Sequence, residues 1–490
     1  MYIRNVINSG GKKIKFLLIY PPSEPSLNSS SNKETAFKGI APPLGLLYIA
    51  RVLEDQGDNI TILDFSAESF DEQKLKNETE KADIVGLTVL SYSLQCSKEI
   101  ITKIKQFKPQ ITVIIGGPHC NLFPEKSLKE TGADICVQGD GELIINDIKN
   151  TIIRKGDFSK IPGIYYKENE KIRKGAPLEL IEDLNTLAFP SRKLIEKYNY
   201  GKEYNPKIKK GEFTSVIMSR GCPYHCKFCS RNSVSMKKYR TRTVENVVKE
   251  LIELSNQGYK YVAFEDDSFI TNINEINRLF ETIIKEKIKM KFIITAARVD
   301  AIDKELFENM RKAGVTHLQF GFESGNQDVL DFYNKNTTIE GIIKAVRLSN
   351  RMGFFTIGTF ILGAPIETKD HFKRTLTFAK SLRLDSVSFL HLKYVAGSDL
   401  WCEAVEKGKI TEDEYIVNSG SEKNLSIMSR HEIDNYCIKA NREYFLRAKF
   451  MVDLLKKSLK NDDLGFLQSF ISLFLSNIRS GFEFFGVVKK

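Results

Sequence analysis

The stretch Ser219–Ser230, SRGCPYHCKFCS, places three of the chain's eight cysteines close together. Their spacing is Cys-x3-Cys-x2-Cys, formed by Cys222, Cys226 and Cys229. Three thiolates on one tight loop can bind three corners of a [4Fe–4S] cube, which leaves one iron open for another ligand. A structural zinc site usually needs four ligands in two separated pairs, and the other cysteines stand alone in the sequence. The spacing therefore predicts a metal cluster with these three cysteines as its ligands.

Length and composition describe an ordinary globular protein. The 490 residues are enough for two or three domains, and hydrophobic residues make up 42% of the chain. No apolar run reaches the roughly 18 residues of a membrane span, and the apolar run near the N-terminus is too short for a signal peptide. We therefore expect a cytoplasmic protein, in which free cysteines serve metal or redox chemistry before disulfides.

The net charge of +11 raises the question of an acidic partner. The lysines are spread along the chain rather than gathered into one block, which is typical of a solvated basic surface. We expect no nucleic-acid partner.

Residues 1–150 alternate short apolar strands with helical segments. This pattern predicts a doubly wound parallel sheet of the Rossmann or flavodoxin-like class, whose ligands bind at the carboxyl ends of the strands. The expected strands are Lys15–Tyr20, Asn59–Phe65, Asp83–Leu90, Gln110–Ile115 and Ala133–Val137.

A second series of strands and helices covers residues 213–400. Six repeats predict a partial (β/α)6 TIM barrel rather than a ring of eight. Residues 151–212 are expected to be a connector with a short strand pair, and residues 401–490 a helical C-terminal region. The expected barrel strands are Ser215–Ser219, Tyr261–Glu265, Lys291–Ala296, His317–Gly321, Phe355–Leu362 and Ser386–Leu390.

The cysteine loop resembles the radical S-adenosylmethionine (SAM) superfamily, whose CxxxCxφC motif follows the first barrel strand. Phe228 fills the aromatic position φ, and the loop follows the expected strand Ser215–Ser219. The resemblance implies that SAM chelates the open iron, and that one electron from the reduced cluster cleaves SAM to a 5′-deoxyadenosyl radical. A zinc site or a plain electron-transfer cluster is the alternative.

Further residues resemble the SAM-binding positions of that family. They lie at the carboxyl ends of expected strands, where barrel enzymes place their chemistry. The resemblance implies acidic residues that meet the amino group of SAM after the second strand, ribose and carboxylate contacts after the third and fourth, and adenine contacts at the fifth. No residue is predicted to act on the substrate itself. The implied SAM contacts are Phe228, Asp266, Asp267, Arg298, Glu323, Ser324, Ile361 and Gly363.

A doubly wound sheet in front of such a barrel resembles the cobalamin-binding (class B) subfamily. The resemblance includes Pro42–Ala50 (PPLGLLYIA), Gly116–His119 (GGPH) and Gly139–Glu142 (GDGE). No histidine stands in the Asp-x-His-x-x-Gly pattern that ligates cobalt in many cobalamin enzymes, so the resemblance implies cobalamin held without a histidine below the metal. The alternative is a fold of this kind that has lost the cofactor, with glycines that only make turns. The implied cobalamin contacts are Ser91, Gly116, Gly117, His119, Gly139 and Glu142.

The C-terminal region carries a weaker resemblance. Asn441–Lys457 is similar to the helical tail of the branch that contains anaerobic porphyrin cyclases and hopanoid methylases. Leu464–Val488 is rich in Phe, Leu and Ile and is expected to pack as amphipathic helices. Peripheral membrane contact and a cover over the barrel mouth are the open alternatives.

Together these features predict a cobalamin-dependent radical SAM enzyme that methylates an unactivated carbon. Its cofactors would be a [4Fe–4S] cluster, SAM and cobalamin, and its electrons would come from an external reductant of the flavodoxin or ferredoxin type. An oxidative cyclase or rearrangement enzyme without methyl transfer, and a non-catalytic cobalamin or iron–sulfur sensor, are the alternatives. A small molecule, a lipid and a tetrapyrrole all stay open as substrates, because specificity resides in loop geometry.

Overall fold

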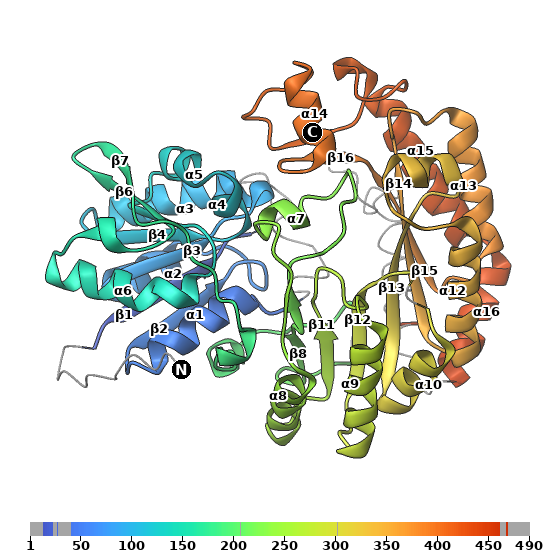
Figure 1. The fold of residues 1–490 in the computed structure, drawn as a ribbon, viewed down its shortest axis with the longest axis horizontal. Coiled ribbons are helices and arrows are strands. Elements are labelled where there is room, and N and C mark those ends of the chain that lie inside the picture. Colours follow the sequence, from blue (N-terminus) through green and yellow to red (C-terminus); the bar gives the residue numbers. More distant parts are fainter. Residues whose placement is uncertain are drawn as a thin grey trace. The chain divides into compact units, whose positions relative to one another are not determined.

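The chain folds into two units in the computed structural model, which describes residues 13–22, 27, 41–205, 207–300, 302–460 and 467–468. The first unit takes in most of the chain up to Glu196, and the second begins at Lys197 and includes the segment Glu182–Thr186. In Figure 1 the first unit is blue to teal, and the barrel of the second runs from green to red.

The first unit is built on a seven-stranded sheet with strand order β2-β1-β3-β4-β5-β6-β7. Strands β1 to β5 are parallel, and β6 and β7 extend the edge as an antiparallel hairpin. The order 2-1-3-4-5 is that of flavodoxin-like folds, in which ligands bind at the switch point between β1 and β3. The strands are β1 (Lys15–Tyr20), β2 (Asn59–Asp64), β3 (Ile84–Thr88), β4 (Thr112–Gly116), β5 (Ile135–Val137), β6 (Ile164–Glu168) and β7 (Lys171–Lys174).

Helices cover both faces of this sheet, α1 and α6 on one face and α3 and α5 on the other (Figure 1). Because both faces are covered, the central strands are apolar on both sides, as in Leu17–Ile19, all of which are buried. The predicted doubly wound class is confirmed. The helices are α1 (Leu44–Glu54), α2 (Glu72–Lys81), α3 (Leu94–Phe107), α4 (Pro118–Leu122), α5 (Pro124–Thr131) and α6 (Gly141–Arg154).

The second unit is an open barrel of six parallel strands in the order β8-β11-β12-β13-β14-β15. Each strand pairs with the next along the chain and none closes the ring, as the sequence predicted. The strands are β8 (Phe213–Val216), β11 (Tyr261–Phe264), β12 (Lys291–Ala297), β13 (Val315–Glu323), β14 (Phe355–Leu362) and β15 (Ser386–His391), with two short pairs formed by β9 (Ser219–Arg220) and β10 (Arg240–Thr241) and by β16 (Lys393–Val395) and β17 (Ile416–Asn418).

The barrel helices pack their apolar stripes against the strands. In α9 the buried residues Ile276, Leu279, Phe280 and Ile283 recur at helical spacing and form one face. Polar side chains define where these helices begin, as Asn272 does by accepting a hydrogen bond from the Glu275 amide. The helices are α7 (Arg231–Val234), α8 (Val244–Asn256), α9 (Ile273–Lys285), α10 (Lys304–Ala313), α11 (Gln327–Phe332), α12 (Ile339–Met352), α13 (Lys369–Ser381), α14 (Asp399–Glu406), α15 (Arg430–Phe445) and α16 (Ala448–Lys460).

The structure differs from the sequence prediction in three elements. The first barrel strand ends at Val216, and Ser219 pairs with Thr241 instead of continuing it. The strand pair expected in the connector joins the front sheet through β5, because β6 supplies hydrogen bonds to an edge that would otherwise be open. The region after Trp401 is not wholly helical, since β17 pairs with β16.

The C-terminal region packs onto the barrel through α15 and α16. Tyr444, Phe445 and Phe450 form a cluster of aromatic rings, and Leu467 packs against the same core. The rest of the predicted helical pair at Leu464–Val488 lies outside the described residues. Among the residues that are described, no helix is both long enough and apolar enough to span a membrane.

Candidate functional site

The three cysteines lie on residues 221–239, termed the cluster loop, between β9 and β10. The two short strands pair at its neck, Ser219 with Thr241 and Arg220 with Arg240. All three cysteines are free thiols of intermediate exposure. The loop therefore leaves the barrel and returns to it at one point, at the carboxyl end of β8, which is the end where barrel enzymes carry their chemistry.

The neck is held from one side by Asp266. Its carboxylate accepts hydrogen bonds from the amides of Met218 (3.1 Å) and Ser219 (2.6 Å) and from the Ser219 hydroxyl (2.5 Å). Burial raises the pKa of Asp266 to about 6, while the hydrogen bonds from Ser219 and Met218 oppose that rise. After Val216, these bonds to a side chain replace backbone pairing with β11, so the first strand is shorter than predicted. Asp266 thus positions the cluster loop, and its predicted contact with SAM is a separate, untested role.

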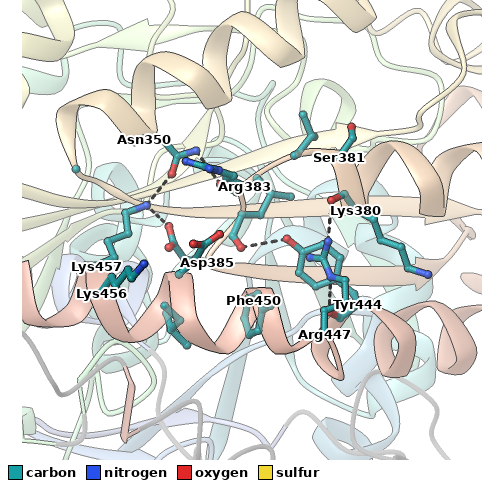
Figure 2. A pocket seen from close by; sticks show the side chains of 15 residues that line it. Asn350, Lys380, Ser381, Arg383, Asp385, Tyr444, Arg447, Phe450, Lys456 and Lys457 are labelled. Atoms are coloured by element: carbon teal, nitrogen blue, oxygen red, sulfur yellow. Dashed lines mark hydrogen bonds and ion pairs between the residues drawn. The ribbon is translucent and has the colours of Figure 1, made fainter.

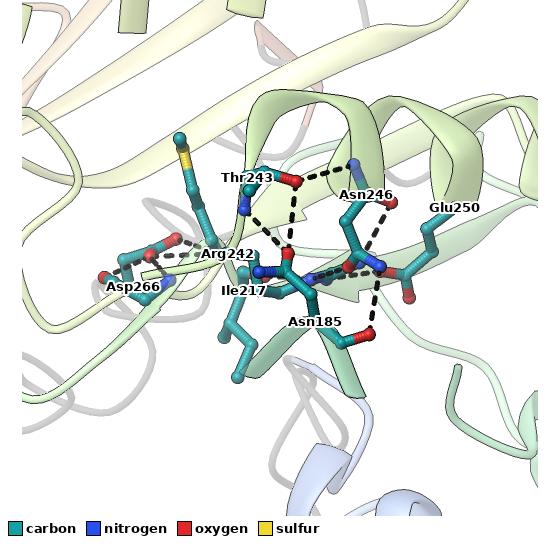
Figure 3. A network of polar contacts seen from close by, with 9 residues as sticks. Asn185, Ile217, Arg242, Thr243, Asn246, Glu250 and Asp266 are labelled. Atoms are coloured by element: carbon teal, nitrogen blue, oxygen red, sulfur yellow. Dashed lines mark hydrogen bonds and ion pairs between the residues drawn. The ribbon is translucent and has the colours of Figure 1, made fainter. Parts of the chain in front are cut away.

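Arg242 holds the neck from the other side (Figure 3). Its guanidinium donates to the Ile217 carbonyl (2.9 Å) and pairs with Glu250 (2.6 Å), and both side chains are almost fully buried. Asn246 accepts a further hydrogen bond from it at 2.7 Å. Because removing one partner of a buried pair costs roughly 3–5 kcal/mol, this pair fixes the bend before the first cysteine firmly.

Gly221 precedes Cys222 and is required by its surroundings. Its φ is +88°, and a Cβ at this position would overlap the carbonyl oxygen of Lys238 and the side chain of Ser235. We expect Gly221→Ala to destabilise the loop by roughly 2–5 kcal/mol, the sum of a left-handed non-glycine residue and local overpacking. The iron content per chain of this variant, measured after anaerobic reconstitution, should fall because the loop that carries the cysteines is destabilised.

Gly258 provides the control, because its φ is +92° and no atom lies within 4 Å of its Cβ position. Gly258→Ala should lower the free energy of unfolding by only roughly 1–2 kcal/mol, the cost of a left-handed alanine. The variant should keep its iron. Equal iron contents in the two variants would contradict the proposed tight packing at Gly221.

The donor set fits a cluster. The Cys222 sulfur accepts a hydrogen bond from the Tyr224 amide, and the Cys229 sulfur accepts one from the Arg231 amide. Burial raises the pKa of Cys229 to about 11, so the thiolate form needs a bound metal to stabilise it. Within the described part of the chain, no three His, Cys, Asp or Glu side chains are grouped tightly enough for one metal ion. Three cysteine ligands on one loop are the number that a [4Fe–4S] cluster with one open iron requires.

Three of the predicted SAM contacts gather around Lys335. Its ammonium pairs with Glu323 at 2.6 Å and lies 5.8 Å from the centre of the Phe228 ring, and its carbonyl accepts a hydrogen bond from Arg298 at 3.0 Å. Arg298 also stacks on the Tyr224 ring at 3.6 Å. The ends of β12 and β13 thus meet the cluster loop.

Glu323 is the last residue of β13 and has a left-handed φ of +63°. Few residues other than glycine take this conformation, and such strain persists where surrounding contacts fix it, often at functional sites. The pairing with β14 slips at this point, between Gly321 and Glu323. The irregularity turns the Glu323 carboxylate toward Lys335.

The remaining predicted SAM residues have different surroundings. Asp267 pairs with Arg231 of the cluster loop at 3.0 Å. Ser324 is fully buried and accepts a hydrogen bond from the Asn326 amide at 3.2 Å. Gly363 has a φ of +111° and donates to Glu367 at 2.7 Å. All of them lie at carboxyl ends of strands, and their contacts with SAM stay predictions.

Ile361 and Phe360 lie on opposite faces of β14. Phe360 is fully buried in the hydrophobic core, whereas Ile361 is partly exposed on the other face of the strand with Thr359. Ile361 therefore lies on the face of β14 away from this core, and its contact with adenine stays a prediction.

Sequence reasoning missed three residues at the site. Lys335 carries no motif, and only its proximity to Glu323 in space reveals it. Tyr224 lies inside the cysteine motif and Arg242 follows the cluster loop, but nothing in the sequence indicates that one stacks on Arg298 and the other holds the neck.

A cavity of about 320 Å³ lies elsewhere on the second unit (Figure 2). Its lining includes Gly353 and Asp385, which come just before β14 and β15, so it opens at the amino ends of the strands. Lys457 fills part of it by pairing with Asp385, and Arg447 donates to the Lys380 carbonyl. The cavity is therefore at the barrel end away from the cysteines.

The predicted cobalamin residues lie at the carboxyl edge of the front sheet. Ser91 and His119 face each other with 3.0 Å between Oγ and Nδ1, and burial lowers the pKa of His119 to about 4, so the imidazole is neutral. Gly117 has a φ of +103°, and a Cβ there would lie 3.0 Å from the side chain of Thr88. The glycine lets the chain turn tightly at this edge, which fits close approach of a bulky ligand.

Gly139 and Glu142 flank the start of α6. A Cβ at Gly139 would lie 2.7 Å from the Leu178 side chain, so packing inside the unit already requires this glycine. Glu142 is in the first turn of α6, where its charge favours the helix N-terminus. Gly116 ends β4, next to Gly117. The contacts of these residues with cobalamin stay predictions.

Comparison with known proteins agrees with both units. A family model described as the radical SAM superfamily matches residues 216–379, and one described as the B12 binding domain matches residues 35–149. The chain is 28% identical to an uncharacterized methyltransferase of Pyrococcus horikoshii, over 90% of this chain and 94% of that protein. It is 27% identical to the anaerobic magnesium-protoporphyrin IX monomethyl ester cyclase of Rubrivivax gelatinosus, over 90% and 80% of the two chains.

A solved structure has the same fold. The radical SAM methyltransferase TsrM of Kitasatospora setae, determined with cobalamin and a [4Fe–4S] cluster bound, matches with a TM-score of 0.66 and 20% identity over 81% of this chain and 75% of that chain.

The chain thus carries a B12-binding domain followed in the sequence by a radical SAM domain, which confirms the two domains predicted from the sequence. These domains imply a [4Fe–4S] cluster, SAM and cobalamin as cofactors.

Proposed function

We propose that this enzyme is a C-methyltransferase that acts on an unactivated carbon of a small molecule. The observation that carries the proposal is the combination, in one chain, of a three-thiol loop at the carboxyl end of an open barrel and a flavodoxin-type B12-binding unit. When bound, the cluster and SAM supply a radical that removes hydrogen, and cobalamin supplies the methyl group. The name of the Pyrococcus horikoshii relative, which is similar over 90% of this chain, supports methyl transfer.

The residues of the chain have defined tasks in this proposal. Cys222, Cys226 and Cys229 hold the cluster, and Asp266 and Arg242 fix the neck from which they project. Arg298 and Glu323 lie at the ends of β12 and β13, where the carboxylate and ribose groups of SAM would bind. Their mutual links through Lys335 hold these two side chains in place before SAM arrives.

Oxidative cyclisation is the second candidate, because a porphyrin cyclase is similar over 90% of this chain. A tetrapyrrole therefore stays among the candidate substrates. We place the enzyme in the cytoplasm, since the cysteines of the chain are free thiols and the cluster needs a reducing compartment. Its electrons would come from an external one-electron carrier.

Methyl-labelled SAM separates the candidates without a known substrate. The reconstituted enzyme, loaded with cobalamin and reduced anaerobically, is given [methyl-14C]SAM. A methyltransferase should form labelled methylcobalamin and S-adenosylhomocysteine, in addition to 5′-deoxyadenosine. Deoxyadenosine without S-adenosylhomocysteine would favour cyclisation or rearrangement. The absence of both products would indicate a sensor.

A further inference from the structure

The cluster loop carries an exposed basic turn. Residues 235–238, termed the lysine turn, follow the short helix α7, and both Lys237 and Lys238 are exposed. No ion pair of either lysine occurs within the described part of the chain. Residues 220–242 hold seven Lys and Arg and no Asp or Glu, out of a net charge of +11 for the whole chain. Residues 220–242 are thus a basic segment around the cluster ligands.

The backbone of the lysine turn is strained. Met236 and Lys237 both have left-handed φ values, +53° and +58°, although neither is glycine. The Lys237 amide donates to the Asn232 carbonyl at 2.8 Å, and the Lys238 amide to the Ser235 carbonyl at 3.0 Å. Two successive residues of this kind cost roughly 2–4 kcal/mol, and the exposed lysine side chains do not offset that cost by burial. The hydrogen bonds to Asn232 and Ser235 hold the backbone of both lysines on the surface of the cluster loop.

The lysine turn lies directly against the first cluster ligand. A Cβ on Gly221 would overlap the Lys238 carbonyl, so the turn packs against the residue that precedes Cys222. Asn232, whose carbonyl holds the turn, also donates through its side-chain amide to the Cys222 carbonyl at 3.1 Å. Two contacts therefore tie the exposed lysines to the backbone of Cys222.

Acidic groups offset the charges of Arg231 and Arg242, the latter through Glu250, but within the described part of the chain none pairs with Lys237 or Lys238. Asp267, at the end of β11, pairs with Arg231 on α7. Asp266 accepts hydrogen bonds from the amides of Met218 and Ser219. Glu265 is buried, and burial raises its pKa to about 7. The lysines therefore present their positive field to solvent.

We propose that the lysine turn is the docking site for a small acidic electron carrier protein of the flavodoxin or ferredoxin type, which reduces the cluster. The inference rests on the proposed function in one respect only, that a cluster is bound and must be reduced. One electron leaves the carrier and enters the cluster, and no proton or group is transferred. Complementary charge steers such partners and raises association rates by roughly 10–1,000-fold at low salt. Docking at this turn places the carrier beside the cluster ligands.

The test compares two reductants on the reconstituted full-length enzyme. Lys237→Glu/Lys238→Glu should slow anaerobic reduction of the cluster by flavodoxin at least roughly tenfold at low ionic strength. Reduction by photoreduced deazaflavin, a small neutral donor, should be unchanged. The rate difference between wild type and variant should vanish near 1 M salt, where the screening length is about 3 Å.

A matched control carries the same charge change at the other end of the barrel. Lys285 and Lys289 are exposed and come just before β12, so Lys285→Glu/Lys289→Glu should keep the flavodoxin rate within about twofold, because distant charges are screened. A second variant, Lys237→Asn/Lys238→Gln, removes both charges, and asparagine tolerates the left-handed conformation at position 237. This variant keeps the test valid if the Lys237→Glu/Lys238→Glu protein loses its iron.

Equal flavodoxin rates in wild type and both lysine-turn variants would overturn the docking site, as would a wild-type cluster that deazaflavin reduces and flavodoxin does not. Failure of the proposed function is a different result, in which neither reductant yields 5′-deoxyadenosine.

Discussion

Replacing Cys226 by alanine should remove the iron cluster and abolish SAM cleavage. Cys226 is the middle ligand, and its carbonyl accepts a hydrogen bond from the Cys229 amide at 2.9 Å, so the two ligands are part of one tight turn. With two thiols left, a cube has no third protein corner, and the resulting loss of affinity cannot be offset by neighbouring groups. Iron and acid-labile sulfide, measured on anaerobically reconstituted protein, should fall to background, and no 5′-deoxyadenosine should form.

Cys402→Ala is the matched control. Cys402 is exposed on α14, outside the cluster loop, and its replacement should leave the iron content and SAM cleavage unchanged. The circular dichroism and thermal unfolding of both variants show whether the barrel stays folded. Full SAM cleavage by Cys226→Ala protein, or tightly held zinc in place of iron in wild type, would contradict the assignment of the ligands.

Much of the fold was accessible from the sequence because it depends on local patterns. The predicted bounds of Phe355–Leu362 match β14 residue for residue, and the helix α8 (Val244–Asn256) lies between the first two predicted barrel strands. The helix begins after Thr243, whose side chain accepts a hydrogen bond from the Asn246 amide, and the strand has an apolar face buried in the core. Helix capping and the periodicity of buried residues depend on residues that are close in the sequence, so a single sequence suffices to locate these elements.

The parts that could not be predicted depend on contacts between distant residues. Ser219 leaves the barrel strand because Asp266, at the end of the neighbouring strand, binds its amide. The strand pair after α6 looks like a connector hairpin in the sequence, and only the open edge of β5 assigns it to the front sheet. Lys335 has no motif, and its role is defined by Glu323 and Arg298. Contacts between residues that are distant in the sequence produce no periodic pattern from which they could be predicted.

Glu323→Gln should destabilise the second unit and weaken SAM binding together. The change leaves the Lys335 ammonium, which is nearly buried, without its counter-charge at 2.6 Å. Breaking a buried pair in this way costs roughly 3–5 kcal/mol. A charge-assisted hydrogen bond contributes about 1.5–3 kcal/mol, so losing the one that Glu323 would accept from the ribose of SAM should weaken binding at least roughly tenfold. Denaturant unfolding and equilibrium dialysis of SAM on cluster-loaded protein measure the two effects.

The double variant Glu323→Gln/Lys335→Met separates stability from binding. Removing both charges takes away the unpaired ammonium, and replacing a buried pair by uncharged groups is often neutral for stability. The free energy of unfolding should therefore return toward the wild-type value. SAM affinity should stay low, because the carboxylate is still absent.

A third variant tests the left-handed backbone conformation at Glu323. Glu323→Gly relieves a φ of +63°, which is worth about 1–2 kcal/mol, while it removes the same carboxylate. Its SAM affinity should equal that of Glu323→Gln, although its stability should be higher. If the double variant binds SAM as tightly as wild type, Glu323 only neutralises Lys335. The left-handed backbone at the end of β13 then positions the carboxylate for the ion pair and not for SAM.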